Sequence, residues 1–391
     1  MRLRGRDRTV ARMVTDTCVS TEWSLWRSHP SEDFTLGVEE EVMLLNAHDW
    51  SLAQQVDRVL MSLPSRLAEQ VKPETHKATL EISTSVHTSA RSVEVELREL
   101  RGSVDLQLAL LGLRAAAAGM HPMTVWHESV VSNGERQREV HGSMRELARR
   151  EPTFALHVHV GIRDPDDAIR TADRMRAHLP LLLALSANSP FWQARDTGLA
   201  SARTPLWQAF PRVGIPRAFG TYAEYVSSVD LLIRSGALPE PTFLWWDVRP
   251  QPRYGTVEVR VMDAQTSVDR TIPLVALVQC LAKLECEEGY ASSTLLAAAE
   301  VLEENRFLAA RDGVEARLIS PEDGRRVSVR NLMDDLMPAL FSHAQDLGCE
   351  SELVGVADLL AFPSAAGQLE LARGSRRLKG LVEALAQQFT A

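Results

Sequence analysis

An acidic stretch near the start of the chain, residues 35–45, constrains the fold more than any other segment. It reads T-L-G-V-E-E-E-V-M-L-L, and its β-branched and large apolar residues favour a strand. Successive side chains of a strand point to opposite faces, so Glu39 and Glu41 share one face about 7 Å apart, with Glu40 on the other. Two carboxylates that close repel each other unless a cation lies over them. The stretch therefore predicts either a solvated acidic edge strand or a strand that binds a divalent metal carrying phosphate.

Three further stretches show the same pattern, with apolar residues on one face and metal- or anion-binding residues on the other. They are T-L-E-I-S at 79–83, L-H-V-H-V-G at 156–161 and T-V-E-V-R-V-M at 256–262. A solvated sheet face usually carries mixed Lys, Thr, Gln and Ser. Here the polar positions are instead Glu81, His157, His159, Glu258 and Arg260. We therefore expect the four strands to share one sheet whose polar face is the active site.

Composition and charge narrow the class of protein. The chain has 391 residues, 45% of them hydrophobic and 24% charged, which is typical of a soluble globular protein of one large or two ordinary domains. The net charge is −9 and no basic stripe is interleaved with aromatics, which argues against nucleic acid as a partner. No apolar run reaches membrane-spanning length. The four scattered cysteines form no C-x-x-C pair, so we expect a cytoplasmic protein without a membrane partner.

The first 30 residues differ from the rest of the chain. Arginines stand at positions 2, 4, 6, 8 and 12, but no apolar segment follows to complete a signal peptide. We expect a flexible basic extension over residues 1–30, with Met13 as an alternative start. Nothing after it marks a sharp boundary, so we expect residues 31–391 to form a single catalytic domain.

Hydrophobic periodicity predicts helices between the strands. Apolar residues recur at spacings of three and four through Ala90–Ala118, which predicts the longest helix, ending at Gly119. A second long helix is expected over Asp166–Leu185. Residues 186–203 have no periodicity, and their polar, aromatic and glycine content indicates a binding loop.

The candidate metal ligands form an oxygen-rich set. They are Glu39, Glu41, Glu81, His157 and Glu258. Carboxylates with one imidazole suit Mg²⁺ or Mn²⁺, whereas a zinc hydrolase usually has more nitrogen or sulfur ligands. An H-x-H pattern alone fits buried structural histidines equally well. A metal-dependent hydrolase that holds zinc through His157 and His159 therefore stays an alternative.

Arginines supply the complementary positive charge. Arg260 shares a face with Glu258 and could bind a phosphate or carboxylate through two N–H groups, or pair with Glu39 or Glu41 instead. Further candidates for binding an anionic substrate or a phosphate tail are Arg195, Arg203, Arg249, Arg253 and Arg306. The chain has no G-x-x-x-x-G-K-[ST] loop, dinucleotide fingerprint or nucleophile elbow. The pattern favours phosphoryl chemistry without a phosphate-binding loop.

In these stretches the sequence resembles the carboxylate–amine ligases related to type 2 glutamate–cysteine ligase, the YbdK-like group. The matching segments run in the family's order from about residue 34 to 313. They are T-L-G-V-E-E-E, L-E-I-S-T, L-H-V-H-V-G, S-A-N-S-P-F-W-Q-A-R-D-T-G, W-W-D-V-R-P-Q-P-R-Y-G-T-V-E-V-R and E-N-R-F-L-A-A-R-D-G. Together they are highly specific, although the C-terminal helices match only loosely.

The resemblance implies the α+β fold shared by glutamine synthetase and the guanido kinases, in which helices back a curved, mainly antiparallel sheet that holds ATP and metal. It also implies that ATP activates a carboxylate to an acyl phosphate, which an amine attacks, releasing ADP and phosphate. The five candidate ligands match the family's metal and nucleotide-metal positions. Arg260 matches the arginine that steadies the phosphoryl group, Glu258 is catalytic as well as a ligand, and His159 would contact substrate.

The substrates are less constrained than the reaction. Leu199 and Ala202 stand where the family commonly has aromatic residues, so glutamate with cysteine is only one candidate pair of small carboxylate and amine. Two alternatives share the fold: a guanido-kinase-like phosphotransferase and a non-catalytic nucleotide-binding protein. The sequence also leaves open whether the chain forms a homo-oligomer.

Overall fold

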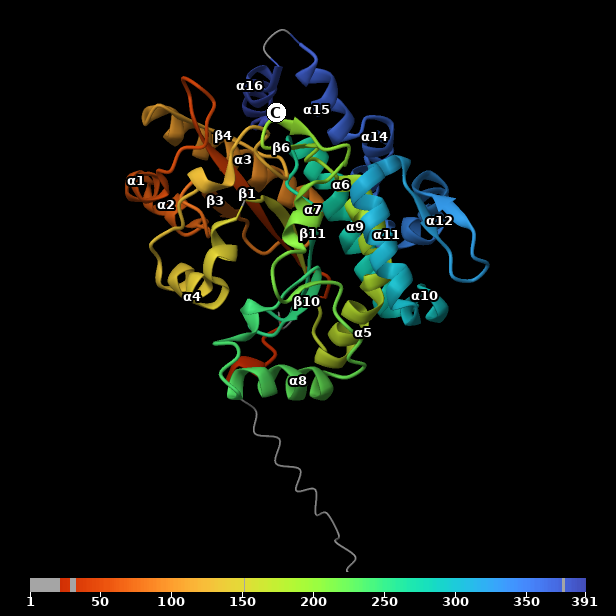
Figure 1. The fold of residues 1–391 in the computed structure, drawn as a ribbon. Helices are drawn as coiled ribbons and strands as arrows, with labels where there is room; N and C mark the ends of the chain where they lie inside the picture. Colours follow the sequence, from red (N-terminus) through yellow and green to blue (C-terminus); the bar gives the residue numbers. More distant parts are fainter. Residues whose placement is uncertain (1–21, 29–32, 151, 375–376) are drawn as a thin grey trace, which may run out of the picture.

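A seven-stranded sheet forms the centre of the molecule (Figure 1). This computed structural model describes residues 22–28, 33–150, 152–374 and 377–391. The strands run in the order β10-β11-β5-β1-β3-β2, with β4 also paired to β1, and every pair in this sheet is antiparallel. Their bounds are β1 Leu36–Asn46, β2 Val71–Pro73, β3 Thr79–Ser83, β4 Leu113–Ala116, β5 Ala155–Gly161, β10 Val248–Gln251 and β11 Thr256–Asp263. The predicted α+β fold with a mainly antiparallel sheet is confirmed.

Strand pairing places the polar residues on one face. Glu39 lies opposite His157, Glu41 opposite Glu81, and Glu258 opposite His159. Residues directly opposite each other on antiparallel strands point to the same side of the sheet. The alternation of apolar and polar residues within each strand thus becomes a division between two faces of the whole sheet.

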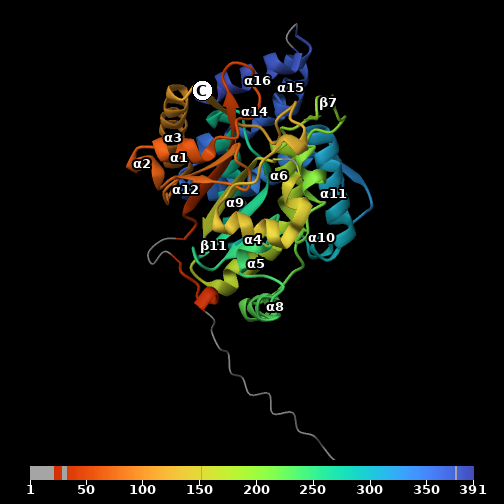
Figure 2. The same cartoon turned by 60° about the vertical axis from the view of Figure 1, so that its left-hand side comes forward.

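Helices cover the apolar face, as Figures 1 and 2 show. The main core packs the apolar sides of β1, β5 and β11 against the surrounding helices. Among these are α3 Ala90–Leu110, α5 Pro165–Met175, α9 Val268–Glu287 and α12 Val329–Leu347, and α6 Leu179–Ser186 is buried among them. A second core packs α1 (Val56–Ser62) and α16 (Arg377–Gln388) against the other half of β1 with β3 and β4.

Shorter elements complete the described chain. The helices are α2 Ser65–Ala68, α4 Glu135–Met144, α7 Arg203–Trp207, α8 Tyr222–Arg234, α10 Ser293–Ala297, α11 Ala299–Asp312, α13 Glu350–Val354, α14 Val356–Ala361 and α15 Ser364–Ala372. Pairs of short strands are β6 Phe191–Trp192 with β7 Arg195–Asp196, β8 Val213–Gly214 with β9 Trp245–Trp246, and β12 Arg317–Ile319 with β13 Arg326–Ser328. None of the described helices is long and apolar enough to span a membrane.

Two predicted helices are shorter than their periodicity indicated. The helix expected over Ala90–Ala118 ends at Leu110, and the chain turns at Gly112 (φ +74°). The residues of β4 then pair with residues 43–46 of β1, whereas β5 pairs with residues 36–40 of the same strand. Pairing with β1 overrides the helix propensity of the alanines there. The helix expected over Asp166–Leu185 is divided by a 3₁₀ turn before Pro180, which lacks the N–H that a continuous helix needs.

The N-terminal part is described only in residues 22–28. This segment, expected to belong to a flexible extension, packs against α8: the Tyr222 hydroxyl donates to the carbonyl oxygen of Ser24 at 2.6 Å. The indole of Trp26 donates to the carbonyl oxygen of Ile162 at 2.8 Å. The packed part of the chain therefore includes residues 22–28, whereas the rest of the expected extension lies outside the described residues.

Candidate active site

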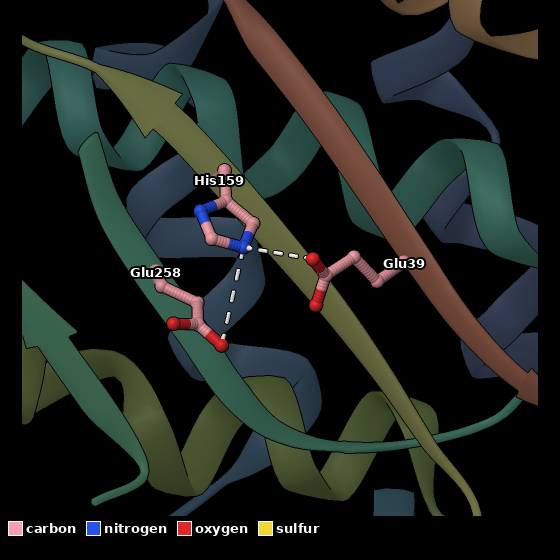
Figure 3. A group of neighbouring side chains, drawn as sticks. All are labelled: Glu39, His159 and Glu258. Atoms are coloured by element: carbon pink, nitrogen blue, oxygen red, sulfur yellow. Dashed lines mark ion pairs between the residues drawn. The ribbon is translucent and has the colours of Figure 1, made fainter. Parts of the chain in front are cut away.

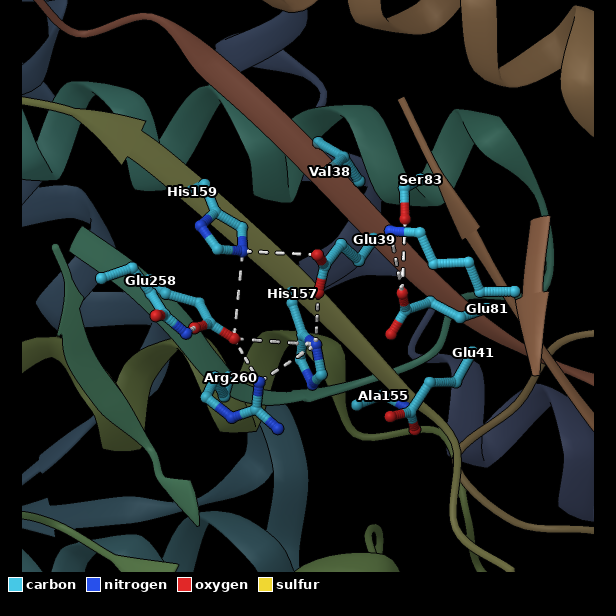
Figure 4. Close-up of polar contacts among 12 residues, drawn as sticks. Val38, Glu39, Glu41, Glu81, Ser83, Ala155, His157, His159, Glu258 and Arg260 are labelled. Carbon is cyan, nitrogen blue, oxygen red and sulfur yellow. Dashed lines mark hydrogen bonds and ion pairs between the residues drawn. The ribbon is translucent and has the colours of Figure 1, made fainter. Parts of the chain in front are cut away.

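The polar face of the sheet forms the floor of a cavity of about 860 Å³. Figure 4 shows the side chains that rise from β1, β3, β5 and β11 into it. The predicted site residues that line the cavity are Glu39, Glu41, Glu81, His157, His159, Arg203, Arg249, Arg253, Glu258 and Arg260. Residues from four strands that are distant in sequence thus meet in one place.

Two predicted arginines lie elsewhere. Arg195 is exposed in the β6–β7 hairpin and is not among the cavity-lining residues. Arg306 is buried on α11, where it pairs with Asp247 and donates to Gln208. Because the main-chain carbonyl of Asp247 accepts a hydrogen bond from the Arg260 amide at 2.7 Å, Arg306 supports the backbone next to the site rather than lining it.

Glu39, His159 and Glu258 form a group suited to a divalent cation (Figure 3). One ligand atom from each lies within 4.8 Å of the others. His159 Nε2 is 3.7 Å from a Glu39 oxygen and 3.9 Å from a Glu258 oxygen. This buried nitrogen has no hydrogen-bond partner among the described residues, whereas Nδ1 is hydrogen bonded to Thr256 at 2.9 Å. An unpartnered ring nitrogen facing two carboxylates fits Mg²⁺ or Mn²⁺.

His157, a predicted metal ligand, lies on the predicted face of the sheet, beside the three-residue group. Its Nδ1 lies 3.3 Å from a Glu39 oxygen and 3.3 Å from an Arg260 nitrogen. Burial and the neighbouring Arg260 lower the pKa of His157 to about 4, so the ring is neutral at physiological pH. The structure therefore brings His159 into the three-residue group, and His157 lies between Glu39 and Arg260.

Glu258 is the most heavily hydrogen-bonded carboxylate of the site. It accepts from Arg249 Nε at 2.8 Å and Gln251 Nε2 at 2.7 Å, and it pairs with Arg260. Burial acts to raise the pKa of Glu258, but Arg249 and Arg260 outweigh it and hold that pKa well below the usual range. A fixed negative charge therefore orients Arg260 on the cavity floor.

The remaining carboxylates divide into two electrostatic classes. Burial acts to raise the pKa of Glu39, but the hydrogen bond with His157 and the electrostatic attraction of His159 outweigh it and keep that pKa well below normal. Burial together with neighbouring carboxylates raises the pKa of Glu41 to about 8 and that of Glu81 well above its usual value. Glu41 and Glu81 can therefore both be ionised at neutral pH only when positive charge is added, which a divalent cation would supply.

A β-bulge positions Arg260. Val259 pairs with Val158 and Met262 with Leu156, so Arg260 and Val261 together lie opposite His157. Bulges bend a strand and redirect a side chain, and they are common beside active sites. Arg203 stabilises this one by donating to the carbonyl oxygens of Val261 at 3.1 Å and Arg260 at 3.3 Å.

The loop over residues 186–203 is anchored to Asp263, which lies just after the same bulge in β11. Buried Asp263 accepts hydrogen bonds from the Asn188 amide at 2.8 Å, the Ser189 hydroxyl at 2.7 Å and the Ser201 hydroxyl at 3.0 Å. This loop carries Arg203 to the bulge. The predicted binding loop thus reaches the site through its backbone anchor and one arginine.

Sequence reasoning missed several cavity residues. They are Arg27, Lys72, Glu74, His76 and Arg136. All of them lie on short strands, loops or a surface helix, where no alternation of polar and apolar residues marks a face. The pattern that identified the four long strands gives no signal for side chains that reach the cavity from its rim.

Comparisons with known proteins cover nearly the whole chain. The glutamate–cysteine ligase family 2 (GCS2) matches residues 35–373. A protein of Rubrobacter xylanophilus provisionally named glutamate–cysteine ligase 2-1 is 39% identical over 350 residues, 90% of each chain. One of Sorangium cellulosum, provisionally named glutamate–cysteine ligase 2, is 36% identical over 91% of this chain and 96% of its own.

Two solved structures share the fold. Glutamate–cysteine ligase from Francisella tularensis, crystallised with AMP, superposes with a TM-score of 0.68 at 13% identity, over 94% of this chain and 90% of that chain. A bifunctional glutathione synthetase from Pasteurella multocida also has a TM-score of 0.68, at 15% identity, over 92% of this chain and 52% of its own. The sheet, its cavity and nearly the whole sequence therefore lead to one conclusion: the chain belongs to glutamate–cysteine ligase family 2.

Proposed function

We propose that this protein is an ATP-dependent carboxylate–amine ligase that forms an amide through an acyl phosphate and releases ADP and phosphate. The observation that carries the proposal is the group of Glu39, His159 and Glu258 beside Arg260 on the cavity floor. Family membership supports it, as do the provisional names of the relatives. The AMP bound in the Francisella tularensis enzyme is consistent with an adenine nucleotide in this fold.

The chemistry requires screening between two anions. When bound, Mg²⁺ or Mn²⁺ screens the repulsion between the substrate carboxylate and the γ-phosphate. Glu39, His159 and Glu258 are the residues that fit the ion, with Glu41 and Glu81 as further oxygen donors on the same face.

Arg260 is placed to stabilise charge on the transferring phosphoryl group. Its guanidinium is held by Glu258 and His157, and its backbone is held by the bulge, so little reorganisation is needed when charge develops. The amine attacks only in its neutral form. Glu41 and Glu81, the cavity carboxylates outside the three-residue group, could accept its proton.

We propose glutamate as the first carboxylate to test and the α-amino group of cysteine as the first amine. Both are small enough for a cavity of about 860 Å³ that also has to hold a nucleotide. A carboxylate substrate with a second negative charge suits the rim arginines Arg27 and Arg253, because a charged pocket rejects ligands that leave its charges unpaired.

The decisive experiment screens carboxylates against amines for ADP release and product mass. We expect ADP to appear only with Mg²⁺ or Mn²⁺ and with both substrates present. AMP and pyrophosphate as products would contradict the acyl phosphate. A stable phosphorylated product would favour a guanido-kinase-like reaction, and ATP-independent hydrolysis with tightly held zinc would favour the hydrolase.

A further inference from the structure

A short N-terminal segment, residues 22–28, forms one wall of the cavity. Arg27 lines the cavity from this segment, together with Glu22, Trp23 and Leu25. The family match begins only at residue 35, so the segment lies outside the matched region. Figures 1 and 2 show it in red beside α8.

The segment is attached to the domain by aromatic side chains. Trp23 packs edge-on against Tyr225 with ring centroids 6.2 Å apart, and Trp26 packs edge-on against Tyr222 at 5.5 Å. The Tyr222 hydroxyl also donates to the Ser24 carbonyl oxygen at 2.6 Å. Aromatic pairs and a partly buried hydrogen bond give a specific docking geometry rather than loose contact.

The turn between β10 and β11 is shaped to receive the segment. The Arg27 amide donates to the Pro252 carbonyl oxygen at 2.9 Å. A Cβ added at Gly255 would lie 2.3 Å from Ser28 Cα, and Gly255 has φ +63°, so only glycine fits both the backbone and the close approach. The docking therefore fixes where the Arg27 backbone enters the cavity rim, next to Arg253.

The buried arginines of the cavity are already engaged. Arg249 and Arg260 pair with Glu258, and Arg203 donates to main-chain carbonyls of the bulge. By contrast, Arg27 and Arg253 have no acidic partner among the residues that the structure describes.

Arg253 connects this rim to the catalytic end of the cavity. Its guanidinium lies 5.7 Å from the centre of the Tyr254 ring, and that ring packs edge-on against His159 at 6.0 Å. Arg27 and Arg253 are both exposed, and both line the cavity, so their positive charge is open to a ligand bound there.

We propose that Arg27, together with Arg253, binds an anionic group of a cavity ligand, either a carboxylate of the substrate or a phosphate of the nucleotide. Both groups are oxyanions that a guanidinium binds through paired N–H groups. The docked segment is then a specificity element of the active site. The inference rests on the proposed function for the identity of these ligands.

Kinetic constants for each ligand separately test the role of Arg27. Arg27→Ala should raise KM for MgATP or for L-glutamate by about five- to tenfold with kcat nearly unchanged, as expected for one partly exposed charged hydrogen bond. Arg27→Lys should recover part of the loss. Arg325→Ala, which removes an exposed arginine beside the β12–β13 turn, is the matched control. Whichever KM rises identifies the group bound, and unchanged values or an equal rise in the control would overturn the proposal.

A second variant tests whether docking positions Arg27. Tyr222 is not among the cavity-lining residues, and Tyr222→Phe removes only its hydrogen bond to Ser24. We expect a smaller rise, about two- to threefold, in the same KM, and no further rise when it is combined with Arg27→Ala. Independent, multiplicative effects would contradict positioning by the segment.

Binding measurements separate this proposal from the proposed function. If the wild-type protein releases no ADP with any carboxylate and amine, the ligase proposal fails. Calorimetric affinities of wild type and Arg27→Ala for MgADP and for L-glutamate then test Arg27 directly. A weaker affinity for either ligand supports the inference, and equal affinities for both overturn it.

Discussion

Glu40 on β1 and Arg101 on α3 form an ion pair that is completely buried on the face of the sheet opposite the cavity. Arg101 donates to the two Glu40 oxygens at 2.8 and 2.7 Å, and neither side chain is exposed to solvent. The remaining N–H groups of Arg101 donate to the main-chain carbonyls of Gln265, Thr266 and Phe389. Of three consecutive glutamates, the middle one thus connects the sheet to helices far away in sequence.

This pair predicts a large stability effect. Arg101→Met should lower the free energy of unfolding by about 3–5 kcal/mol, because it leaves the Glu40 carboxylate buried and unpaired. Urea denaturation followed by circular dichroism measures it. Arg98→Ala, on the same helix but partly exposed, is the control and should cost less than about 1 kcal/mol. Equal losses in the two variants would contradict the assignment.

For Glu39, one residue earlier in the sequence, we expect mainly a loss of activity instead of a loss of stability. Glu39→Gln should reduce substrate-dependent ADP release by on the order of 100-fold, because the carboxylate faces the proposed cation and the phosphoryl group. The ionised carboxylate also stabilises the fold through His157, so the melting temperature should fall, but by less than would account for the loss of activity at about 25 °C. Glu300→Gln, at an exposed position on α11, is the control for the charge change. Full activity in Glu39→Gln would remove this residue from the catalytic group.

Gly119 packs closely against Asp263, the residue that anchors the 186–203 loop, so a larger side chain at position 119 should destabilise the protein. A Cβ at Gly119 would lie 2.5 Å from Asp263 Cγ and 2.8 Å from Ser189 Oγ, so Gly119→Ala should destabilise the protein by about 1–3 kcal/mol. It should also lower activity by displacing the loop that carries Arg203. Gly102→Ala on α3 has nothing within 4 Å and should instead stabilise by about 0.5–1 kcal/mol. Thermal denaturation of both variants gives the comparison.

Glu285 predicts a dependence of stability on pH. Burial acts to raise the pKa of this carboxyl, but hydrogen bonds from His178 and Arg174 outweigh it and lower the pKa below its unfolded value. Its stabilisation is therefore present above about pH 4.3 and is lost as pH falls through the lowered value. Urea denaturation at about pH 6 should show wild type more stable than Glu285→Gln by about 1–3 kcal/mol, and the difference should shrink below about pH 4. A difference that grows in acid would contradict the sign.

The composition of the cavity floor was predictable because a strand fixes which side chains share a face. That rule placed Glu39 with Glu41 and His157 with His159 before any strand pairing was known. It does not fix strand order or register. Which histidine pairs directly across from Glu258 depends on the register of β5 with β11, which is a long-range property.

Other features depended on packing that local sequence does not encode. The alanines after Gly112 favour a helix locally, yet they complete the ladder along β1. Arg306 stands in a motif shared with the family, but its partner Asp247 is 59 residues away. The packing of residues 22–28 has no local signal, because Ser24 and its partner Tyr222 are 198 residues apart.

The central position of β1 also affects how the protein gains activity during folding. Glu39 meets His157 across 118 residues of sequence, and His157 meets Arg260 across another 103. Pairings between such distant segments form slowly compared with local helices. Recovery of catalysis after dilution from denaturant should therefore follow the slowest step of sheet assembly and lag behind the early return of helical signal, so that enzymatic turnover reports when β11 has joined the sheet.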